Sequence, residues 1–238
     1  MKSFRDLKIK NFADGANIDS MIALAAQKHI QGLTTNPTLM KQSGIIDYAQ
    51  FANQVLQQIK DKPISFEVFA DDFDEMRRQA LQIASWGSNV YVKIPVTTTD
   101  GTQCSGLVRE LSSEGVKLNV TALLTTDQVQ MVAEHLDPST PAVVSVFAGR
   151  IADTGVDPLP IMARSLEILR SLPKAELLWA SPRELLNIVQ ADEVGCQIIT
   201  VTPDLLKKLE LIGKDLSQFS LETVQMFHRD AQEAGFSL

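Results

Sequence analysis

The chain has 238 residues, of which 45% are hydrophobic, and its 22 Lys and Arg against 29 Asp and Glu give a net charge of −7. This length and apolar content suffice for one complete core, so we expect a single domain over residues 1–238. The acidic balance and the lack of a basic block argue against a nucleic-acid surface and favour small molecules as partners.

Short apolar segments alternate with helical stripes along the chain. In the first unit, for example, Ile18, Met21 and Ala25 follow an apolar segment at helical spacing, and Gly32 then fits a helix C-terminus. The predicted strands are residues 10–14, 32–36, 64–70, 89–97, 116–122, 142–147, 176–180 and 197–201. The predicted helices are residues 18–25, 48–59, 76–84, 104–111, 129–136, 162–169, 185–189 and 203–209.

These eight strand-then-helix units predict an α/β fold, a single-domain (β/α)8 TIM barrel, because the alternation implies a parallel sheet and eight strands close one. A doubly wound open sheet is the alternative. It fits less well because no strand leads into a GxGxxG or Walker A turn. Residues 220–234 predict an extra C-terminal helix whose stripe of Leu221, Val224 and Phe227 packs across a barrel or a neighbouring subunit.

Location and redox chemistry follow from two absences in the sequence. The first residues lack the apolar stretch of a signal peptide, and no run is long enough to span a bilayer, so we expect a cytoplasmic protein without membrane contact. Cys104 and Cys196 have neither CxxC spacing nor nearby histidines. We therefore expect them to pack as small apolar residues, with no metal site.

The segment from Asn89 to Thr97 is an apolar run with Lys93 in its middle. Such a run is typical of a parallel strand covered on both faces, where a lysine is seldom buried without a partner. Burial disfavours the charged form, and the free amine is the form that attacks carbonyl carbons. The alternative is a structural lysine that reaches the rim or ends in a buried salt bridge.

Polar residues share one parity in three successive predicted strands. The residues on this parity are Ser65, Glu67, Phe69, Tyr91, Lys93, Pro95, Lys117, Asn119 and Thr121. The opposite parity, which would face the helices, is apolar. Asp14, Asn36 and Ser145 can join the inward group from the ends of their own strands. Because an unpartnered buried polar group costs about 1–3 kcal/mol, these side chains must satisfy one another or a ligand.

Five motifs occur in order at successive strand ends. They are TTNP at residues 34–37, VKIPVT at 92–97, NVT at 119–121, SVFAGRI at 145–151 and ASPR at 180–183. In these motifs and their order the chain resembles the transaldolases and the closely related fructose-6-phosphate aldolases, which are class I aldolases built on a TIM barrel. The resemblance covers nearly the whole chain and favours a functional role for Lys93.

The resemblance implies a role for each matching residue. It makes Lys93 the Schiff-base lysine, Asp14 the acid and base of aldol cleavage, and Glu67 and Thr121 the pair that positions a catalytic water. The residues matched to substrate binding are Thr34, Asn36, Asn119, Ser145, Phe147, Arg150, Ser181 and Arg183. Asn36 and Asn119 are expected to bind the dihydroxyacetone moiety. The phosphate site is expected to consist of Ser145, Arg150, Ser181 and Arg183.

The resemblance also sets the expected activity and assembly. Transaldolase activity on sugar phosphates is the leading interpretation, and an iminium at Lys93 would need neither metal nor organic cofactor. The alternatives are a fructose-6-phosphate aldolase using the same iminium and a non-catalytic sugar-phosphate-binding protein. Glu67 and Phe147 match transaldolases, whereas the aldolases typically have Gln and Tyr there. By resemblance to the short-chain members, a homo-oligomer is expected.

Two residues depart from the family pattern. Gly15 follows Asp14 where a hydroxyl residue is usual, and Pro182 stands between Ser181 and Arg183 where an aromatic residue is commoner. The first change is expected to loosen contacts with sugar hydroxyls. The second is expected to change the direction of Arg183.

Overall fold

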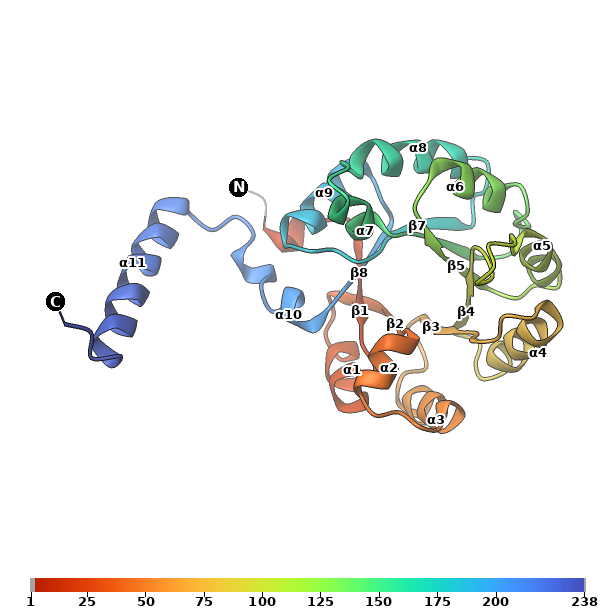
Figure 1. Cartoon of the computed structure of the whole chain (residues 1–238), viewed down its shortest axis with the longest axis horizontal. Coiled ribbons are helices and arrows are strands. Elements are labelled where there is room, and N and C mark those ends of the chain that lie inside the picture. Colours follow the sequence, from red (N-terminus) through yellow and green to blue (C-terminus); the bar gives the residue numbers. More distant parts are fainter. Residues whose placement is uncertain (1–2, 238) are drawn as a thin grey trace.

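The protein forms a closed barrel of eight parallel strands in the computed structural model, which describes residues 3–237 (Figure 1). Each strand pairs with the next along the chain, and β8 pairs with β1 to close the sheet. Helices surround this barrel on the outside (Figure 1). The predicted TIM barrel is confirmed, and the alternative of an open sheet is wrong.

The strands lie close to the predicted segments. Their bounds are β1 Lys10–Asp14, β2 Ile30–Thr34, β3 Ile64–Glu67, β4 Val90–Pro95, β5 Leu118–Leu123, β6 Ala142–Val146, β7 Ala175–Trp179 and β8 Ile198–Val201. The helices up to β6 are η1 Phe4–Asp6, α1 Ile18–Ala25, α2 Pro37–Gln42, α3 Tyr48–Gln58, α4 Phe73–Ala84, α5 Ser105–Ser113 and α6 Thr126–Ala133. After β6 they are α7 Ala148–Asp153, α8 Leu159–Leu169, α9 Leu186–Val194, α10 Pro203–Leu206, η2 Leu209–Leu211 and α11 Leu216–Glu233.

Two short helices replace expected loops. Helix α2 follows β2 directly, because Asn36 accepts a hydrogen bond from the Leu39 N–H as N-cap and Pro37 occupies the first turn. Helix α7 also follows its strand closely, with Phe147 as the one residue between β6 and α7, but it has no side-chain cap. Both helices begin at the C-terminal ends of strands, which is the end of a TIM barrel where active sites lie.

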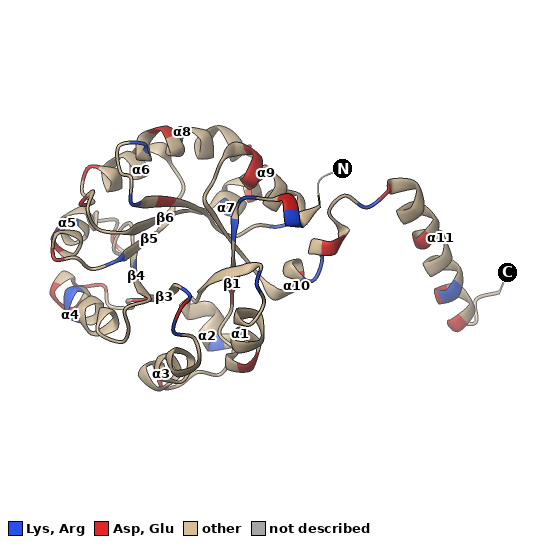
Figure 2. Cartoon of the chain, turned by 180° about the vertical axis from the view of Figure 1, so that it is seen from behind, with Lys and Arg blue, Asp and Glu red and all other residues tan. Residues whose placement is uncertain are grey.

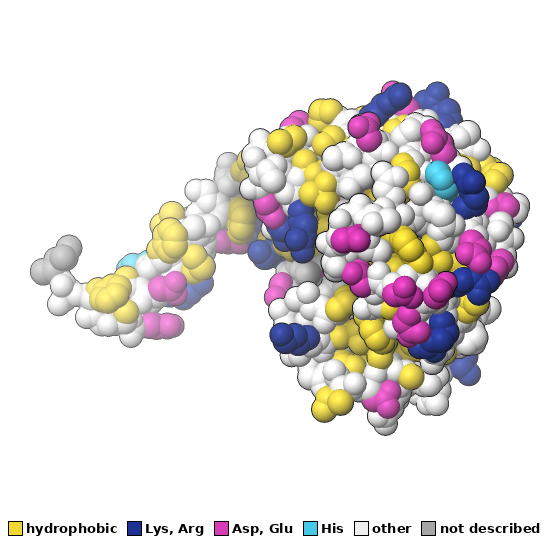
Figure 3. Space-filling view, turned by 45° about the vertical axis from the view of Figure 1, so that its right-hand side comes forward, with side chains coloured by type: hydrophobic (Ala, Val, Ile, Leu, Met, Phe, Trp, Pro, Cys, Tyr) yellow, Lys and Arg dark blue, Asp and Glu magenta, His cyan; other side chains and the backbone are white. Residues whose placement is uncertain are grey.

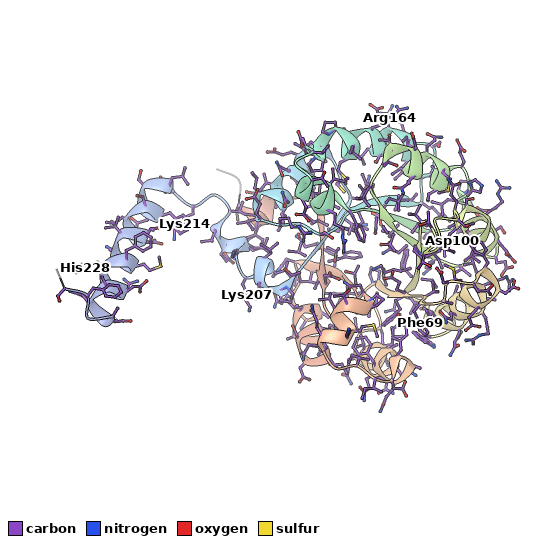
Figure 4. All side chains as sticks on the ribbon, viewed as in Figure 1. Phe69, Asp100, Arg164, Lys207, Lys214 and His228 are labelled. Carbon is purple, nitrogen blue, oxygen red and sulfur yellow. The ribbon has the colours of Figure 1, made fainter. Side chains whose placement is uncertain are left out.

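Two of the predicted boundaries that differ from the structure have a clear cause. Gly32 lies inside β2 instead of at a helix C-terminus, and a Cβ there would come within 2.5 Å of the Phe12 ring, so only glycine fits. Strand β3 ends at Glu67, and Phe69 is 68% exposed instead of pointing inward (Figure 4). The chain leaves the sheet there because Gln79 of α4 accepts hydrogen bonds from the N–H groups of Phe69 and Ala70.

Inward and outward positions divide the apolar side chains into two groups. The outward residues Val92, Ile94 and Val120 are buried in the large cluster between the strands and helices, as the parity predicted. A smaller cluster occupies inward positions and consists of Phe12, Val143, Leu178, Ala180 and Ile198, with Tyr91 and Phe147 packed against it. This inner cluster therefore fills the barrel on the same parity as the polar residues.

The C-terminal helix α11 extends away from the barrel (Figures 1 and 2). It begins at Leu216, four residues before the predicted start at Ser220, and none of its residues is buried. Lys214, in the connection to α11, pairs with Glu222 and lies 4.7 Å from the centre of the Phe219 ring (Figure 4). The alternative that this helix packs across its own barrel is wrong. No helix in residues 3–237 combines the length and the hydropathy that crossing a bilayer requires.

Candidate active site

A cavity of about 360 Å³ opens at the C-terminal ends of the strands. Every predicted site residue except Arg183 lines it, together with Pro37, Thr38, Leu39, Gln42, Ala122, Leu178, Ala180 and Thr200. The strands bring the predicted residues together by simple register, since Lys93 pairs with Glu67 on one side and with Asn119 on the other. These three side chains therefore stand at one level on adjacent strands.

Lys93 is buried, with 7% of its surface exposed, and has two partners. Its Nζ lies 3.0 Å from Glu67 Oε2 and donates to the Thr35 carbonyl at 2.9 Å. An ammonium has three donors, so one is left for the cavity. The ion pair expected of a structural lysine is present, but both of its members line the cavity, where a substrate can reach them.

Asp14 ends β1 and lines the same cavity as Lys93, whose charge acts on it. Its Oδ1 accepts a hydrogen bond from Thr34 Oγ1 at 2.7 Å, and that hydroxyl lies 2.5 Å from Thr200 Oγ1. Burial raises the pKa of Asp14 above its ordinary value, while the positive charge of Lys93 and the Thr34 hydrogen bond oppose this rise. A carboxyl with a raised pKa is suited to exchange protons near neutral pH. Thr34 thus orients Asp14 with the hydroxyl that was predicted to bind substrate.

Asn119 lies at the centre of a buried hydrogen-bond chain. Ser145 Oγ donates to Asn119 Oδ1 at 2.6 Å, and Asn119 Nδ2 donates to Ser65 Oγ at 3.0 Å. These bonds fix the orientation of the amide and leave one N–H of Nδ2 for a ligand. Asn36 is fixed in a comparable way, because its Oδ1 caps α2 and its amide nitrogen stays available.

Thr121 differs from these residues because its buried Oγ1 has no hydrogen-bond partner within the described part of the chain. It lies on β5 beside Pro95 and lines the cavity. A buried hydroxyl without a partner is costly, so this oxygen is available to a ligand or a water. That availability fits the predicted role of Thr121 in holding a water.

Backbone strain is concentrated at the cavity. Ala122 and Ser181 have positive φ angles of 66° and 58°, and both line the cavity. Such conformations cost about 1–3 kcal/mol each and persist only where the surroundings enforce them. Gly149 leaves room for the Ser181 backbone, because a Cβ at Gly149 would lie 1.5 Å from the Ser181 carbonyl oxygen. Helix α7 can therefore lie directly against the residues after β7.

The two predicted phosphate arginines lie in different surroundings. Arg150 of α7 lines the cavity, with its guanidinium 5.6 Å from the centre of the Phe147 ring. Arg183 instead forms a two-point ion pair with Asp153, in which Nε donates to Oδ1 at 3.0 Å and Nη2 contacts Oδ2. This pairing lowers the pKa of Asp153. Of the predicted cluster, Arg150, Ser145 and Ser181 thus reach the cavity and Arg183 does not.

Some cavity residues were not predicted, although a signal existed. Thr200 has inward parity in β8 and contacts Thr34, so the rule of period two identifies it.

Gly15 leaves open space, because a Cβ there would meet nothing within 4 Å. The hydroxyl residue that the family pattern led us to expect at this position would therefore fit there.

The two cysteines pack inside the protein, as the sequence predicted for small apolar residues. Both cysteines are buried, and burial raises the pKa of Cys196 to about 12, so its thiol is poorly nucleophilic at neutral pH. Residues 3–237 contain no group of three or more His, Cys, Asp or Glu placed to hold a metal ion.

Comparison with known proteins supports the family resemblance. Residues 11–238 match the family described as Transaldolase/Fructose-6-phosphate aldolase. A relative named "Probable transaldolase" from Thermoanaerobacter sp. (strain X514) is 32% identical over 97% of this chain and 100% of its own length. A second of the same name, from Nitrosopumilus maritimus (strain SCM1), is 32% identical over 90% of this chain and 92% of its own.

Among solved structures, a dihydrodipicolinate synthase from Rhodopseudomonas palustris aligns with a TM-score of 0.59. The alignment covers 97% of this chain and 81% of that one at 16% identity, and it supports the barrel fold alone. The family match and the two relatives extend over nearly all of the barrel and its cavity. The chain therefore belongs to the transaldolase/fructose-6-phosphate aldolase family.

Proposed function

We propose that this protein is a transaldolase that moves a dihydroxyacetone unit from a ketose phosphate to an aldose phosphate through a Schiff base at Lys93. One observation carries the proposal: Lys93 Nζ stands at the wall of a polar cavity, 3.0 Å from the Glu67 carboxylate, and Asp14 lines the same cavity within the influence of the Lys93 charge. A nucleophilic amine with two carboxyl groups around it is the set that aldol cleavage needs.

The proposed reaction begins when the Lys93 amine attacks the ketone carbon of the donor. The adduct loses its oxygen as water, and Glu67 with the water held at Thr121 transfers the protons of this step. Asp14 then takes the proton of the hydroxyl beside the bond to be cleaved. As that bond breaks, its electron pair moves into the iminium to give an enamine, and an aldose phosphate leaves. A second aldose phosphate enters, and the same steps run in reverse.

Substrate binding divides between two sides of the cavity in this proposal. Asn36 and Asn119 hold the hydroxyl groups of the dihydroxyacetone unit with their remaining N–H donors. Arg150 and Ser181 hold the phosphate, because both line the cavity. Arg183 joins them only by exchanging Asp153 for the phosphate, an exchange between two anions of similar geometry.

The nearest alternative is a fructose-6-phosphate aldolase, and the side chain of Phe147 favours the transaldolase over it. This ring lines the cavity and has no hydroxyl to protonate the enamine. Without that donor the enamine persists until an acceptor arrives, so transfer outruns release. The wild type is therefore expected to transfer efficiently to erythrose 4-phosphate and to release little dihydroxyacetone from fructose 6-phosphate alone.

The Phe147→Tyr variant is expected to shift the balance toward release. A product assay with fructose 6-phosphate, with and without erythrose 4-phosphate, measures both rates for each protein. Equal rates of release and transfer in the wild type would instead identify an aldolase. If neither product forms while the sugar phosphate still binds, the protein is a non-catalytic binder.

We also propose that α11 contacts a second copy of this chain. The helix leaves its own barrel with Leu221, Val224 and Phe227 exposed, the last two by more than half. Figure 3 shows hydrophobic side chains on the surface of this protruding helix. Water contact with so many apolar side chains on one helix is unfavourable, and a partner would remove it. Deleting residues 215–238 is expected to lower the assembly mass in sedimentation velocity while each barrel stays folded. The same mass for the full-length and shortened proteins would contradict this.

A further inference from the structure

Strand β2 ends before β3 does, so the last residue of β3, Glu67, has no β2 residue paired with it. Strand β2 pairs with β3 only at Leu33 with Ile64 and at Thr34 with Ser65, and Thr35 N donates to the Ser65 carbonyl at 3.2 Å. Beyond this point the chain turns into α2. In a parallel strand, the N–H and C=O of residues two apart point to the same side. The backbone groups of Glu67 therefore face the side on which β2 has ended.

The Tyr48 hydroxyl makes the backbone hydrogen bonds that a strand neighbour would otherwise make with Glu67. The Glu67 N–H donates to the Tyr48 hydroxyl oxygen at 2.7 Å, and the same hydroxyl donates to the Glu67 carbonyl oxygen at 3.0 Å. Tyr48 is the first residue of α3, so its hydroxyl reaches β3 from the helical layer. The Tyr48 hydroxyl alone therefore provides hydrogen-bond partners for both the N–H and the C=O of Glu67, the residue whose carboxylate pairs with Lys93.

The Tyr48 ring is held in place by other aromatic rings. Trp86 packs against it edge to face with ring centres 5.5 Å apart, and Phe66 does so at 6.2 Å. Burial raises the pKa of the Tyr48 phenol well above its ordinary value, and the nearby Glu67 charge adds to this. The hydroxyl thus keeps its proton, and its donor role, at every pH at which the protein works.

We infer that Tyr48 is a positioning residue for the reaction at Lys93: through the backbone of Glu67, it holds the Glu67 carboxylate within reach of the Lys93 amine. This inference rests on the proposed function, because it assigns Glu67 to proton transfer during Schiff-base formation. Tyr48 itself does not line the cavity and acts only through Glu67.

The test compares the two tyrosines of the chain. Tyr48→Phe removes the hydroxyl and keeps the ring, and Tyr91→Phe makes the same change in the inner cluster of the barrel, away from the cavity. Tyr48→Phe is expected to lower kcat about 10- to 100-fold, since small misplacements of catalytic groups have costs of that order, with KM little changed. It is also expected to change the shape of the pH–rate profile, because a group that transfers protons is then displaced from the Lys93 amine. Tyr91→Phe should leave kcat and the profile unchanged.

A second measurement gives a result even if the Tyr48→Phe variant does not fold. In the Tyr91→Phe protein Tyr48 is the remaining tyrosine, so uniform incorporation of 3-fluorotyrosine places a fluorine probe there alone. Its resonance is expected to shift when a ketose phosphate is trapped on Lys93 with borohydride, because the Glu67 partner then changes. An unmoved resonance, or equal kinetics for the two Phe variants, would overturn the inference. Absence of any trapped adduct in the wild type would instead refute the proposed function.

Discussion

Lys93→Met is expected to abolish turnover of ketose phosphates while the barrel stays folded. Methionine has a similar length and no amine, so the covalent step has no nucleophile. The change also leaves the Glu67 carboxylate without its partner, 3.0 Å away in the wild type. Because Glu67 lines the cavity, water can solvate it, and the loss of stability should stay below the value of about 3–5 kcal/mol known for fully buried pairs.

Two controls accompany this variant. Lys117→Met removes a lysine next to β5 whose Nζ donates to the Ser88 carbonyl at 2.6 Å, away from the cavity, and should leave activity intact. The double variant Lys93→Met with Glu67→Gln should regain stability, since no unpaired charge remains. Steady-state kinetics and thermal melting measure both effects. Full activity in Lys93→Met would mean that Lys93 is a structural residue, which only forms a buried salt bridge with Glu67 and takes no part in the reaction.

Asp14→Asn is expected to lower kcat about 10²- to 10⁴-fold, the usual contribution of a general acid and base. Asparagine can still accept the hydrogen bond from Thr34 Oγ1, which reaches Asp14 at 2.7 Å, so the geometry around Lys93 should persist. It cannot take or return a proton. Schiff-base formation at Lys93 should therefore survive, while cleavage of the carbon–carbon bond becomes slow.

The same variant is expected to be more stable than the wild type at neutral pH. Burial raises the pKa of Asp14, so the folded protein binds this proton more tightly than the unfolded chain does. The stabilising contribution of Asp14 is present below the ordinary pKa of an aspartate and is lost as the pH rises through the raised value. An asparagine side chain does not titrate, so the melting curves of the two proteins across this pH range should converge at acid pH. An Asp14→Asn protein with wild-type kcat would refute the acid and base assignment.

The strand pattern predicted much of the site because barrel geometry follows from local sequence. Glu67, Lys93 and Asn119 share one parity on adjacent strands, and register then fixes them as neighbours. Asp14 and Thr121 follow by the same rule from their positions in β1 and β5. These predictions needed only the alternation of side chains and the order of the strands.

The rest depends on contacts between segments that no local pattern contains. Phe69 is exposed because Gln79 of α4 accepts a hydrogen bond from its N–H. Arg183 is oriented by its ion pair with Asp153 of α7, and the segment of α7 was predicted to be a loop. Tyr48 begins the predicted helix at residues 48–59, but its hydroxyl finds both of its partners on Glu67 of β3, which no pattern within the helix indicates. Such polar contacts depend on how distant segments pack together, and local sequence patterns do not contain that information.

The central claim is that Lys93 forms the covalent intermediate, and borohydride trapping tests it most directly. The wild-type protein is incubated with fructose 6-phosphate and reduced, and its peptides are analysed by mass spectrometry. We expect the mass of the reduced three-carbon unit or sugar adduct to appear on the peptide containing Lys93 and on no other lysine. Labelling of a different lysine, or no adduct under conditions of turnover, would contradict it.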